Sequence, residues 1–265
     1  MALPPLIRAP FGQQPPDTDL AFQQWLETEQ GRAVLESQRG VLGEVLHRVP
    51  GQRAAQIGLG EQPRLLDDCG MPCRWYLGRR AERGNDAVAL PAALPLGKRS
   101  LDLVLLHHSL DFEDHPHKVL REAVSALQPG GWLVVIGFNP FSLWGFTRLF
   151  RLASGQVPWS ARFLRPIRLS DWLNLLSCQV EGLESGFFAP PGKRGARGEL
   201  RWLEQLGQRF WHQRGAFYVL VARKRAVIMR PLKPKLGLRE QQPRQVAVPI
   251  AGAGRQRHSG RNEST

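Results

Sequence analysis

Short apolar runs alternate with helix-like segments through the middle of the chain, from Arg53 to Ala222. Runs of about four to eight apolar residues are typical of buried strands, and their alternation with helical patterns is typical of βαβ units. We therefore predict an α/β fold with a mostly parallel sheet. The predicted strands occupy residues 54–57, 74–77, 86–90, 101–106, 132–136, 179–188 and 216–222.

The segment from Asp17 to Val49 carries apolar residues at helical spacing. We predict a helical N-terminal extension there, broken at Gly31 and Gly40, that covers the main domain as a lid. It follows a Pro-rich start with no apolar stretch of signal-peptide length.

Sequence signals also predict where three later helical segments begin or end. Pro63 is placed to begin a helical turn after the first strand. Asp114 is predicted to cap a helix that begins at Pro116 and ends at the Pro-Gly-Gly turn of residues 129–131. Ser170 is predicted to cap the next helix.

The net charge of +13 is not spread evenly over the 265 residues. Residues 223–265 contain eleven Lys/Arg and two acids, a net charge of +9, which leaves +4 for the rest of the chain. This tail has no aromatic residue to stack on a nucleotide base, and its composition predicts disorder. Contact with nucleic acid through Arg223 to Arg261 is therefore expected to be weak and salt-sensitive.

Cysteine usage and hydropathy indicate the compartment. An odd number of cysteines, three, in a long chain is typical of a reducing environment. No uninterrupted apolar run approaches the length of a membrane span. We predict a cytoplasmic protein with no membrane partner.

The loop after the first strand is the first candidate ligand site, because ligands of open α/β sheets bind beyond the carboxyl ends of the strands. Gln56 is followed by Gly58 and Gly60, which permit a tight turn and let backbone amides approach a ligand. Pro63 stands where a dinucleotide fingerprint has its third glycine, so that fingerprint is excluded. The alternative is a loop that only turns the chain.

Four histidines lie between residues 107 and 117, after the fourth strand. Their spacing matches no metal-ligand pattern, so no metal site is predicted. His107 and His108 are the candidate catalytic residues, because imidazole titrates near neutral pH and can accept a proton there. Asp111 or Glu113 is a candidate orienting group. The alternative for either histidine is a hydrogen-bonded structural role.

An aromatic-rich stretch follows the fifth strand. Asn139, Phe141 and Trp144 are predicted to wall a substrate pocket, with Asn139 orienting the substrate. The alternative is a turn followed by core aromatic residues.

The central block of the chain resembles the class I S-adenosylmethionine-dependent methyltransferases. An Asp-containing strand (99–105), a Leu-Arg-Glu helix segment (119–123) and a Pro-Gly-Gly turn leading into a strand (127–133) follow the family's order, and Leu-Pro at residues 94–95 precedes them. Residues 139–145 and the N-terminal extension are similar to one bacterial subgroup of this family. The resemblance covers about residues 25–224.

This resemblance implies a Rossmann-like seven-stranded sheet with helices on both faces, in which the last strand is antiparallel. It also implies S-adenosylmethionine as cofactor. We therefore divide the chain into a Pro-rich segment with a helical lid (residues 1–48), a methyltransferase domain (49–224) and the basic tail (225–265). The implied cofactor-binding residues are Gln56, Gly58, Gly60, Asp86 and His107.

Two acids of the family pattern are missing. Gln56 stands where the first motif has an acid, and Gly78-Arg79-Arg80 contains none where the second strand is expected to hold the cofactor ribose. Asp86 is the remaining candidate acid. Each missing acid removes a charge-assisted hydrogen bond of about 1.5–3 kcal/mol.

Three hypotheses of function follow. The first is a methyltransferase whose favoured acceptor is a small molecule. In such an enzyme the protein mainly has to hold the acceptor nucleophile, the methyl group and the cofactor sulfur in line. The missing acids prompt the second, a degenerate methyltransferase fold that acts as a non-catalytic binding or scaffold protein. The third is an RNA-directed methyltransferase that uses the basic tail for phosphate contacts.

Overall fold

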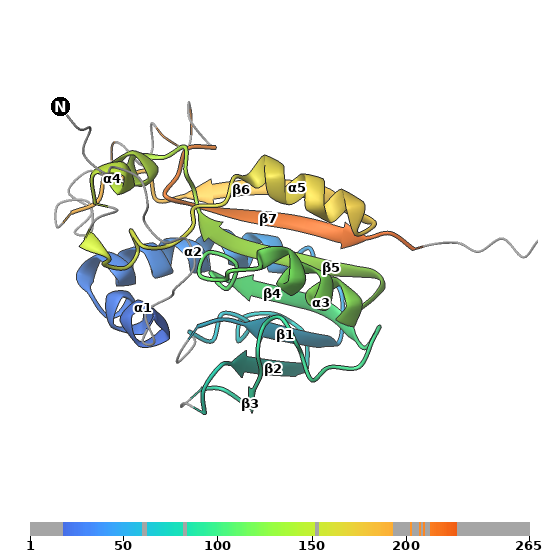
Figure 1. Cartoon of the computed structure of the whole chain (residues 1–265). Helices are drawn as coiled ribbons and strands as arrows, with labels where there is room; N and C mark the ends of the chain where they lie inside the picture. The colour runs from blue at the N-terminus through green and yellow to red at the C-terminus, as the bar shows by residue number, and fades with distance from the viewer. Residues whose placement is uncertain are drawn as a thin grey trace, which may run out of the picture. The chain divides into compact units, whose positions relative to one another are not determined.

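The computed structural model describes residues 18–59, 63–81, 84–151, 154–192 and 213–226, together with residues 202, 207 and 209. These residues build one seven-stranded sheet in the order β3-β2-β1-β4-β5-β7-β6 (Figure 1). The first five strands are parallel, and β7 pairs antiparallel with both β5 and β6. The strands are β1 (Arg53–Ile57), β2 (Cys73–Gly78), β3 (Ala87–Val88), β4 (Leu101–His107), β5 (Leu127–Phe138), β6 (Cys178–Gly186) and β7 (Phe217–Lys224).

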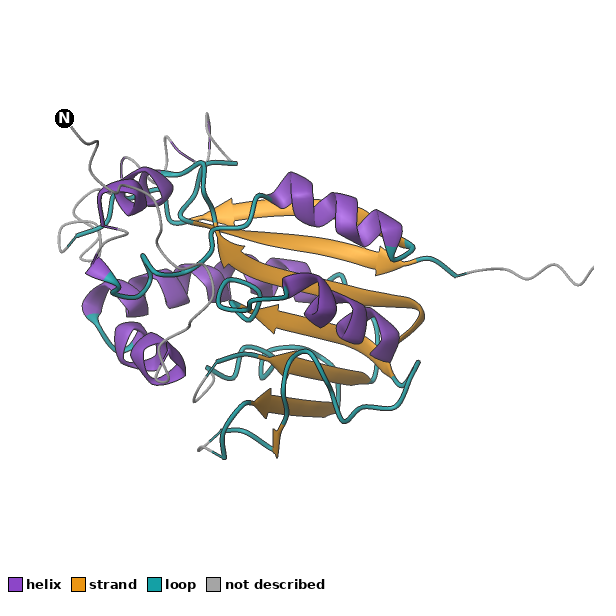
Figure 2. Ribbon diagram, in the orientation of Figure 1, coloured by secondary structure: helices purple, strands orange, loops and turns teal. Residues whose placement is uncertain are grey.

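Helices cover both faces of this sheet. They are α1 (Thr18–Leu26), α2 (Glu29–Leu46), α3 (Pro116–Ala126), α4 (Leu143–Arg151) and α5 (Pro166–Leu175). Figure 2 shows α3 and α5 in front of the sheet and α2 behind it. The predicted fold class is therefore confirmed.

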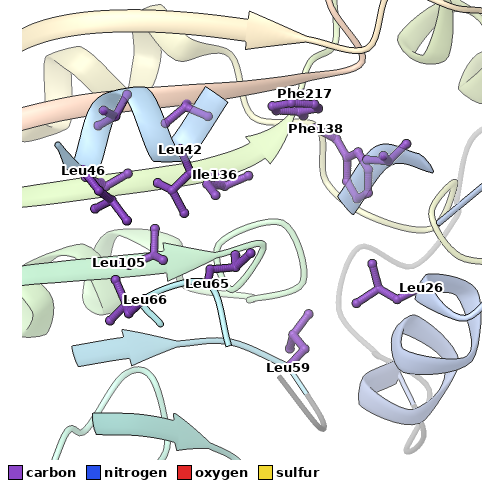
Figure 3. Close-up of a cluster of buried hydrophobic side chains, with 14 of the residues drawn as sticks. Leu26, Leu42, Leu46, Leu59, Leu65, Leu66, Leu105, Ile136, Phe138 and Phe217 are labelled. Atoms are coloured by element: carbon purple, nitrogen blue, oxygen red, sulfur yellow. The ribbon is translucent and has the colours of Figure 1, made fainter. Parts of the chain in front are cut away.

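Two buried apolar clusters follow from the alternation of side chains along the strands. Leu103 and Leu105 of β4 point to the α1–α2 face, and Val104 and Leu106 point to the α3–α5 face. Figure 3 shows part of the first cluster, with Leu42 and Leu46 of α2 beside Ile136 of β5. The central strands are apolar on both faces because both faces are covered.

The break in the N-terminal helix differs from the prediction. The break lies between α1 and α2, where the Thr28 hydroxyl accepts a hydrogen bond from the Gly31 amide (3.0 Å) and caps α2. Gly31 and Gly40 both lie inside α2. A Cβ atom on Gly31 would lie 2.1 Å from the Trp25 carbonyl oxygen, so this glycine permits close approach of α1 rather than a helix break.

Two helix caps were also predicted wrongly. Asp114 caps no helix, because its carboxylate binds Arg162 (2.9 Å) and the residue that precedes α3 is His115. Ser170 lies within α5, which begins at Pro166 because the fixed φ of proline suits a first helical turn. Residues 129–131 belong to β5, since α3 already ends at Ala126.

Some sequence predictions fall on other parts of the chain. The Pro-rich start lies outside the described residues, and so does the tail beyond residue 226. The three domain boundaries stay predictions. Within the described ranges, no helix is both long and apolar enough to cross a lipid bilayer.

Candidate functional site

The parallel strands end at one edge of the sheet, and α1 lies beyond that edge (Figure 1). Phe22 of α1 is fully buried there. Its ring centroid lies 6.0 Å from that of His107, 5.3 Å from that of His108 and 5.3 Å from that of Phe112. The N-terminal helix therefore covers the end of β4.

Four polar side chains form a buried cluster at the end of β4, which we call the polar cluster: Gln38, His107, His108 and Asp111. Gln38 of α2 contacts both imidazoles, at 3.1 Å from His107 Nε2 and 2.8 Å from His108 Nε2. The other ring nitrogen of His108, Nδ1, lies 2.8 Å from Asp111 Oδ2. Each of the four residues is at most 1% exposed.

Asp111 sets the direction of these hydrogen bonds. Its Oδ2 atom accepts from the Phe138 amide (3.0 Å), so it also accepts from a protonated His108 Nδ1. His108 Nε2 is then a lone-pair acceptor, to which the Gln38 amide donates. The Gln38 oxygen is left to accept from His107 Nε2–H. This assignment gives His108 a single ring proton, on Nδ1, and agrees with the lowered pKa values of both imidazoles.

Burial explains the protonation states of the cluster. It lowers the pKa of His107 well below its ordinary value, and the neighbouring His108 adds to this effect. Burial lowers the pKa of His108 to about 3. It raises the pKa of Asp111 well above the ordinary carboxyl value, and burial together with Asp111 raises that of Tyr218. The cluster is a low-charge polar network within an apolar surrounding.

The backbone turns sharply to place these groups. The His108 amide donates to the Ile136 carbonyl (3.0 Å), and the Asp111 amide donates to the His108 carbonyl (3.2 Å). His108 has φ +51°, a left-handed conformation that is uncommon for residues other than glycine. Non-glycine residues in this conformation concentrate at functional sites.

Gln56, a cofactor-binding residue implied by the resemblance, binds the loop that follows β1. Its side-chain amide donates to the Pro63 carbonyl (2.7 Å), and its oxygen accepts from the Leu65 amide (3.0 Å). Residues 65–68 form turns, so the helical turn predicted to begin at Pro63 is absent there. The Gly58 amide donates to the Leu77 carbonyl of β2 (3.3 Å). Gly60 lies outside the described residues.

The end of β2 carries no acid of its own. Asp86 accepts from the Tyr76 amide (2.9 Å), so one of its oxygens is engaged with the backbone of β2. Arg79 follows β2, pairs with Glu113 and lies 3.9 Å from Asp19 Oδ1 of α1. The acids at this strand end therefore come from other elements, Asp19 from α1 and Glu113 from the segment before α3. Burial raises the pKa of Asp19.

The three predicted pocket residues have different surroundings. The Asn139 amide donates to the Gln213 carbonyl (2.8 Å), and its oxygen accepts from the Phe141 amide (3.0 Å). Trp144 is fully buried, and its indole donates to the Ala189 carbonyl (3.1 Å). The Phe141 side chain is 59% exposed. Asn139 thus organises the backbone after β5, while Trp144 belongs to the core.

A cavity of about 420 Å³ lies nearby, between the junction of α1 with α2 and residues 156–159. Trp25 and Trp159 are its aromatic walls, and Gln30 and Arg151 are among its polar walls. Asn139, Phe141 and Trp144 are not among the described residues that line it. Two ring contacts connect the cavity to the polar cluster. The ring centroids of Trp25 and Phe138 lie 5.7 Å apart, and those of Phe138 and His108 lie 4.2 Å apart.

Residues 77–135 match a family model described as a methyltransferase domain. This segment includes β4, α3 and the polar-cluster residues His107, His108 and Asp111, and it lies in a sheet with the strand order given above. By this match, residues 77–135 are similar to a methyltransferase domain. The resemblance inferred from the sequence is confirmed, and S-adenosylmethionine is the cofactor of this family.

The curated relatives of this chain are themselves named as uncharacterized proteins. It is 33% identical over 145 residues to the protein YafS of Escherichia coli K12, which covers 54% of this chain and 57% of that protein. It is 29% identical over 200 residues to Rv2003c of Mycobacterium tuberculosis, which covers 72% and 69% of the two chains. The chain therefore spans little more than half of the E. coli relative.

Solved structures share the methyltransferase fold. A SAM-dependent methyltransferase from Thermotoga maritima matches with a TM-score of 0.57 at 20% identity, over 77% of this chain and 95% of that one. A chain from a complex of a methyltransferase activator with a methyltransferase of Haloferax volcanii matches with a TM-score of 0.52 at 15% identity, over 78% and 97%. At these identities the likeness shows the fold alone.

Two buried oxygen atoms near the strand ends suit the binding of a nucleoside cofactor. Asp19 Oδ1 and Ser109 Oγ are buried without a hydrogen-bond partner. Asp19 faces the end of β2, and Ser109 follows β4. Buried oxygens without partners are costly, and hydroxyl or amino groups of a ligand can satisfy them. The donor and acceptor set is therefore compatible with S-adenosylmethionine.

Sequence reasoning missed Gln38, Asp19 and the two cavity tryptophans. A signal for Gln38 exists, because Val34 and Leu42 stand four residues to either side on the buried face of α2. An amide at such a position needs a partner in the core. The sequence contains no comparable signal for Asp19, which stands at the start of α1, a position where acids are common.

Proposed function

We propose that this protein transfers a methyl group from S-adenosylmethionine to a small-molecule acceptor. One observation carries the proposal: within the methyltransferase domain, the polar cluster lies at the carboxyl end of β4, beneath α1 and α2. Class I folds of this kind bind ligands at that edge of the sheet. The acceptor, its methylated atom and the catalysis itself are parts of this proposal.

The cofactor would be held at the ends of β1, β2 and β4. When bound, it supplies an electrophilic methyl group on a positively charged sulfur. Asp19 would replace the missing acid beside β2. The residues proposed from the sequence complete the site: Gln56, Gly58, Gly60, Asp86 and His107.

His108 is the better of the two candidate bases. Asp111 keeps the proton on Nδ1, which leaves Nε2 as the basic nitrogen, as in other carboxylate–histidine pairs. Gln38 covers that nitrogen, and burial keeps the pKa of His108 at about 3. Displacement of Gln38 with α2 would admit solvent and raise this pKa toward its ordinary value. His107 stays a second candidate.

The cavity beside Trp25 and Trp159 is the proposed acceptor site. Its volume of about 420 Å³ lies within the range of small-molecule pockets. The predicted pocket residue Trp144 would support the two cavity tryptophans from the core. Its ring centroid lies 6.1 Å from that of Trp25 and 5.6 Å from that of Trp159. Flat aromatic walls favour an acceptor with an apolar or ring-containing body.

Titration calorimetry with S-adenosylmethionine and S-adenosylhomocysteine tests the cofactor step. We expect heat from both ligands, and no heat at millimolar ligand would overturn the proposal. Transfer of a radiolabelled methyl group to small-molecule fractions of a cell extract tests the chemistry. His108→Gln should abolish that transfer and retain cofactor binding, while His117→Ala, at an exposed position, is the matched control.

A non-catalytic binding protein is the second candidate, and one observation favours it. Phe22 and Gln38 leave His107 and His108 at most 1% exposed. Cofactor binding without transfer to any fraction would support this candidate. The RNA-directed alternative rests on residues outside the described ranges except near the end of β7, where Arg223 donates to the Gly130 carbonyl (3.2 Å) and lies over the Trp132 ring.

We place this activity in the cytoplasm. The described cysteines Cys69, Cys73 and Cys178 are free thiols. Free thiols are typical of reducing compartments and agree with this location.

A further inference from the structure

Helix α4 turns its apolar side away from the protein. Phe146 is 62% exposed, Leu149 66% and Phe150 74%, and the Phe146 and Phe150 rings contact each other with their centroids 5.2 Å apart. Trp144 faces inward, and so does Arg148, whose Nε atom donates to the Trp159 and Ala161 carbonyls (3.1 and 2.9 Å). A helix on a globular surface normally has the opposite arrangement.

The outward side of α4 is part of a larger apolar surface, the α4 patch. It comprises the exposed side chains of Phe141, Leu143, Phe146, Leu149 and Phe150. Large apolar side chains exposed together on one helix are typical of an interaction site, because their contact with water is unfavourable. The α4 patch contributes to neither of the buried apolar clusters.

Charge identifies the partner. Residues 139–170 contain five arginines and no Asp or Glu. Arg148 faces inward and Arg162 pairs with Asp114, so the remaining three supply the exposed charge. Arg165 lies over the Phe141 ring (5.4 Å), and Arg151 is exposed in the last turn of α4. Aromatic and leucine side chains bordered by arginines are the composition of helices that lie in the interface of an anionic membrane.

Two other occupants fit less well. A second copy docked symmetrically on the α4 patch would bring Arg151 and Arg165 close to their copies with no acid from the same segment to pair them. An RNA strand would use the phenylalanines for stacking and leave Leu143 and Leu149 without a role. The interface of a bilayer accommodates both the aromatic and the leucine side chains.

We propose that the α4 patch docks this protein on the surface of an anionic phospholipid bilayer. Phe146, Leu149 and Phe150 enter the headgroup region, and Arg151 and Arg165 lie at the level of the phosphates. Docking of this type needs no membrane-spanning helix, and it departs from our sequence-based expectation of no membrane partner. The inference does not depend on methyl transfer or cofactor binding.

Co-sedimentation with lipid vesicles tests the docking. The full chain should bind vesicles of phosphatidylcholine mixed with phosphatidylglycerol, and bind poorly to phosphatidylcholine alone or at high salt. The double variant F146S/F150S should bind the anionic vesicles at least about tenfold more weakly. Because the variant retains the whole basic tail, this difference isolates the α4 patch.

The matched control is L90S/L175S, which removes two exposed leucines elsewhere and should bind like the unchanged chain. Circular dichroism melting should give similar Tm values for all three proteins. Equal vesicle binding by F146S/F150S and the unchanged chain would overturn the proposal. It would also be overturned if the phenylalanine variant converted a dimer to a monomer, or lost retention of RNA, without a change in vesicle binding.

Discussion

The two faces of the sheet are built from the same kinds of strand but differ at the carboxyl edge. The buried cluster on the face covered by α3 and α5 is mostly apolar and includes Val119 and Leu120 of α3 and Val104 of β4, with Tyr218 as its main polar member. The face covered by α1 and α2 has a similar apolar cluster, yet it buries the polar cluster at the edge. Buried polar groups stabilise a fold less efficiently than apolar groups. We therefore expect the first face to stabilise the domain, and the proposed chemistry belongs to the second.

The largest expected effect is on the apolar face. Leu120→Ala removes a fully buried side chain and leaves a cavity, so it should lower the free energy of unfolding by about 2–5 kcal/mol. Urea denaturation measures this. Leu175→Ala, at an exposed position of α5, is the control and should change the value by no more than about 0.5 kcal/mol. An equally small loss for Leu120→Ala would contradict the structural role of this face.

On the other face, Asp19→Asn should weaken binding of S-adenosylhomocysteine. Replacing the charged acceptor beside β2 removes about 1.5–3 kcal/mol, equivalent to a Kd about tenfold to hundredfold higher. Titration calorimetry measures the Kd, with Asp68→Asn at an exposed position as control. An unchanged Kd would mean that α1 does not supply the missing acid.

Gln38→Leu tests whether the polar cluster is a connected network. The change keeps a side chain of similar size but leaves His107 Nε2–H and His108 Nε2 without partners. Stability should fall by about 1–3 kcal/mol. Glu36→Gln, exposed on the same helix, provides the baseline in denaturation experiments. If Gln38→Leu raised stability, the two faces would not differ as described.

The smallest effect concerns pH. The pKa values of His107 and His108 are lowered in the folded state and that of Asp111 is raised. As the pH falls through the ordinary histidine pKa of about 6.5, the unfolded chain takes up protons at both histidines that the folded chain does not, which lowers stability. The raised pKa of Asp111 acts in the opposite direction. Because two histidines oppose one carboxyl, stability should fall on acidification below about pH 6, by up to about 1.4 kcal/mol per pH unit for each unmatched proton.

His107→Gln sharpens this test, because it leaves one histidine to balance Asp111. The loss of stability on acidification should then be smaller than in the unchanged chain. Denaturant unfolding at a series of pH values measures both slopes, with His117→Ala as the control. A slope that is the same with and without His107 would show that its neutral state does not stabilise the fold.

The sheet could be predicted from the sequence because its strands are short apolar runs with clear ends. The strand from Leu101 to His107 is the clearest case, since it is buried on both faces. Helix α4 could not be predicted in this way. Its apolar residues face outward, so its hydrophobic pattern does not report burial. The break at Thr28 was missed because two glycines nearby gave the more obvious signal.

The candidate site could be predicted only in part. His107 and His108 follow from their place at a strand end. Gln38 stands 69 residues before His107 in the chain, so their contact depends on how α2 packs on the sheet. Asp19 likewise reaches the end of β2 only through the position of α1. Local sequence signals do not contain such long-range contacts.

A crystal structure with S-adenosylhomocysteine bound is the most direct test of the proposed site. We predict that the ligand lies at the carboxyl ends of β1, β2 and β4, with Asp19 beside its ribose and His108 near its sulfur. Binding elsewhere, for example in the cavity between Trp25 and Trp159, would contradict the assignment of the polar cluster to the chemistry.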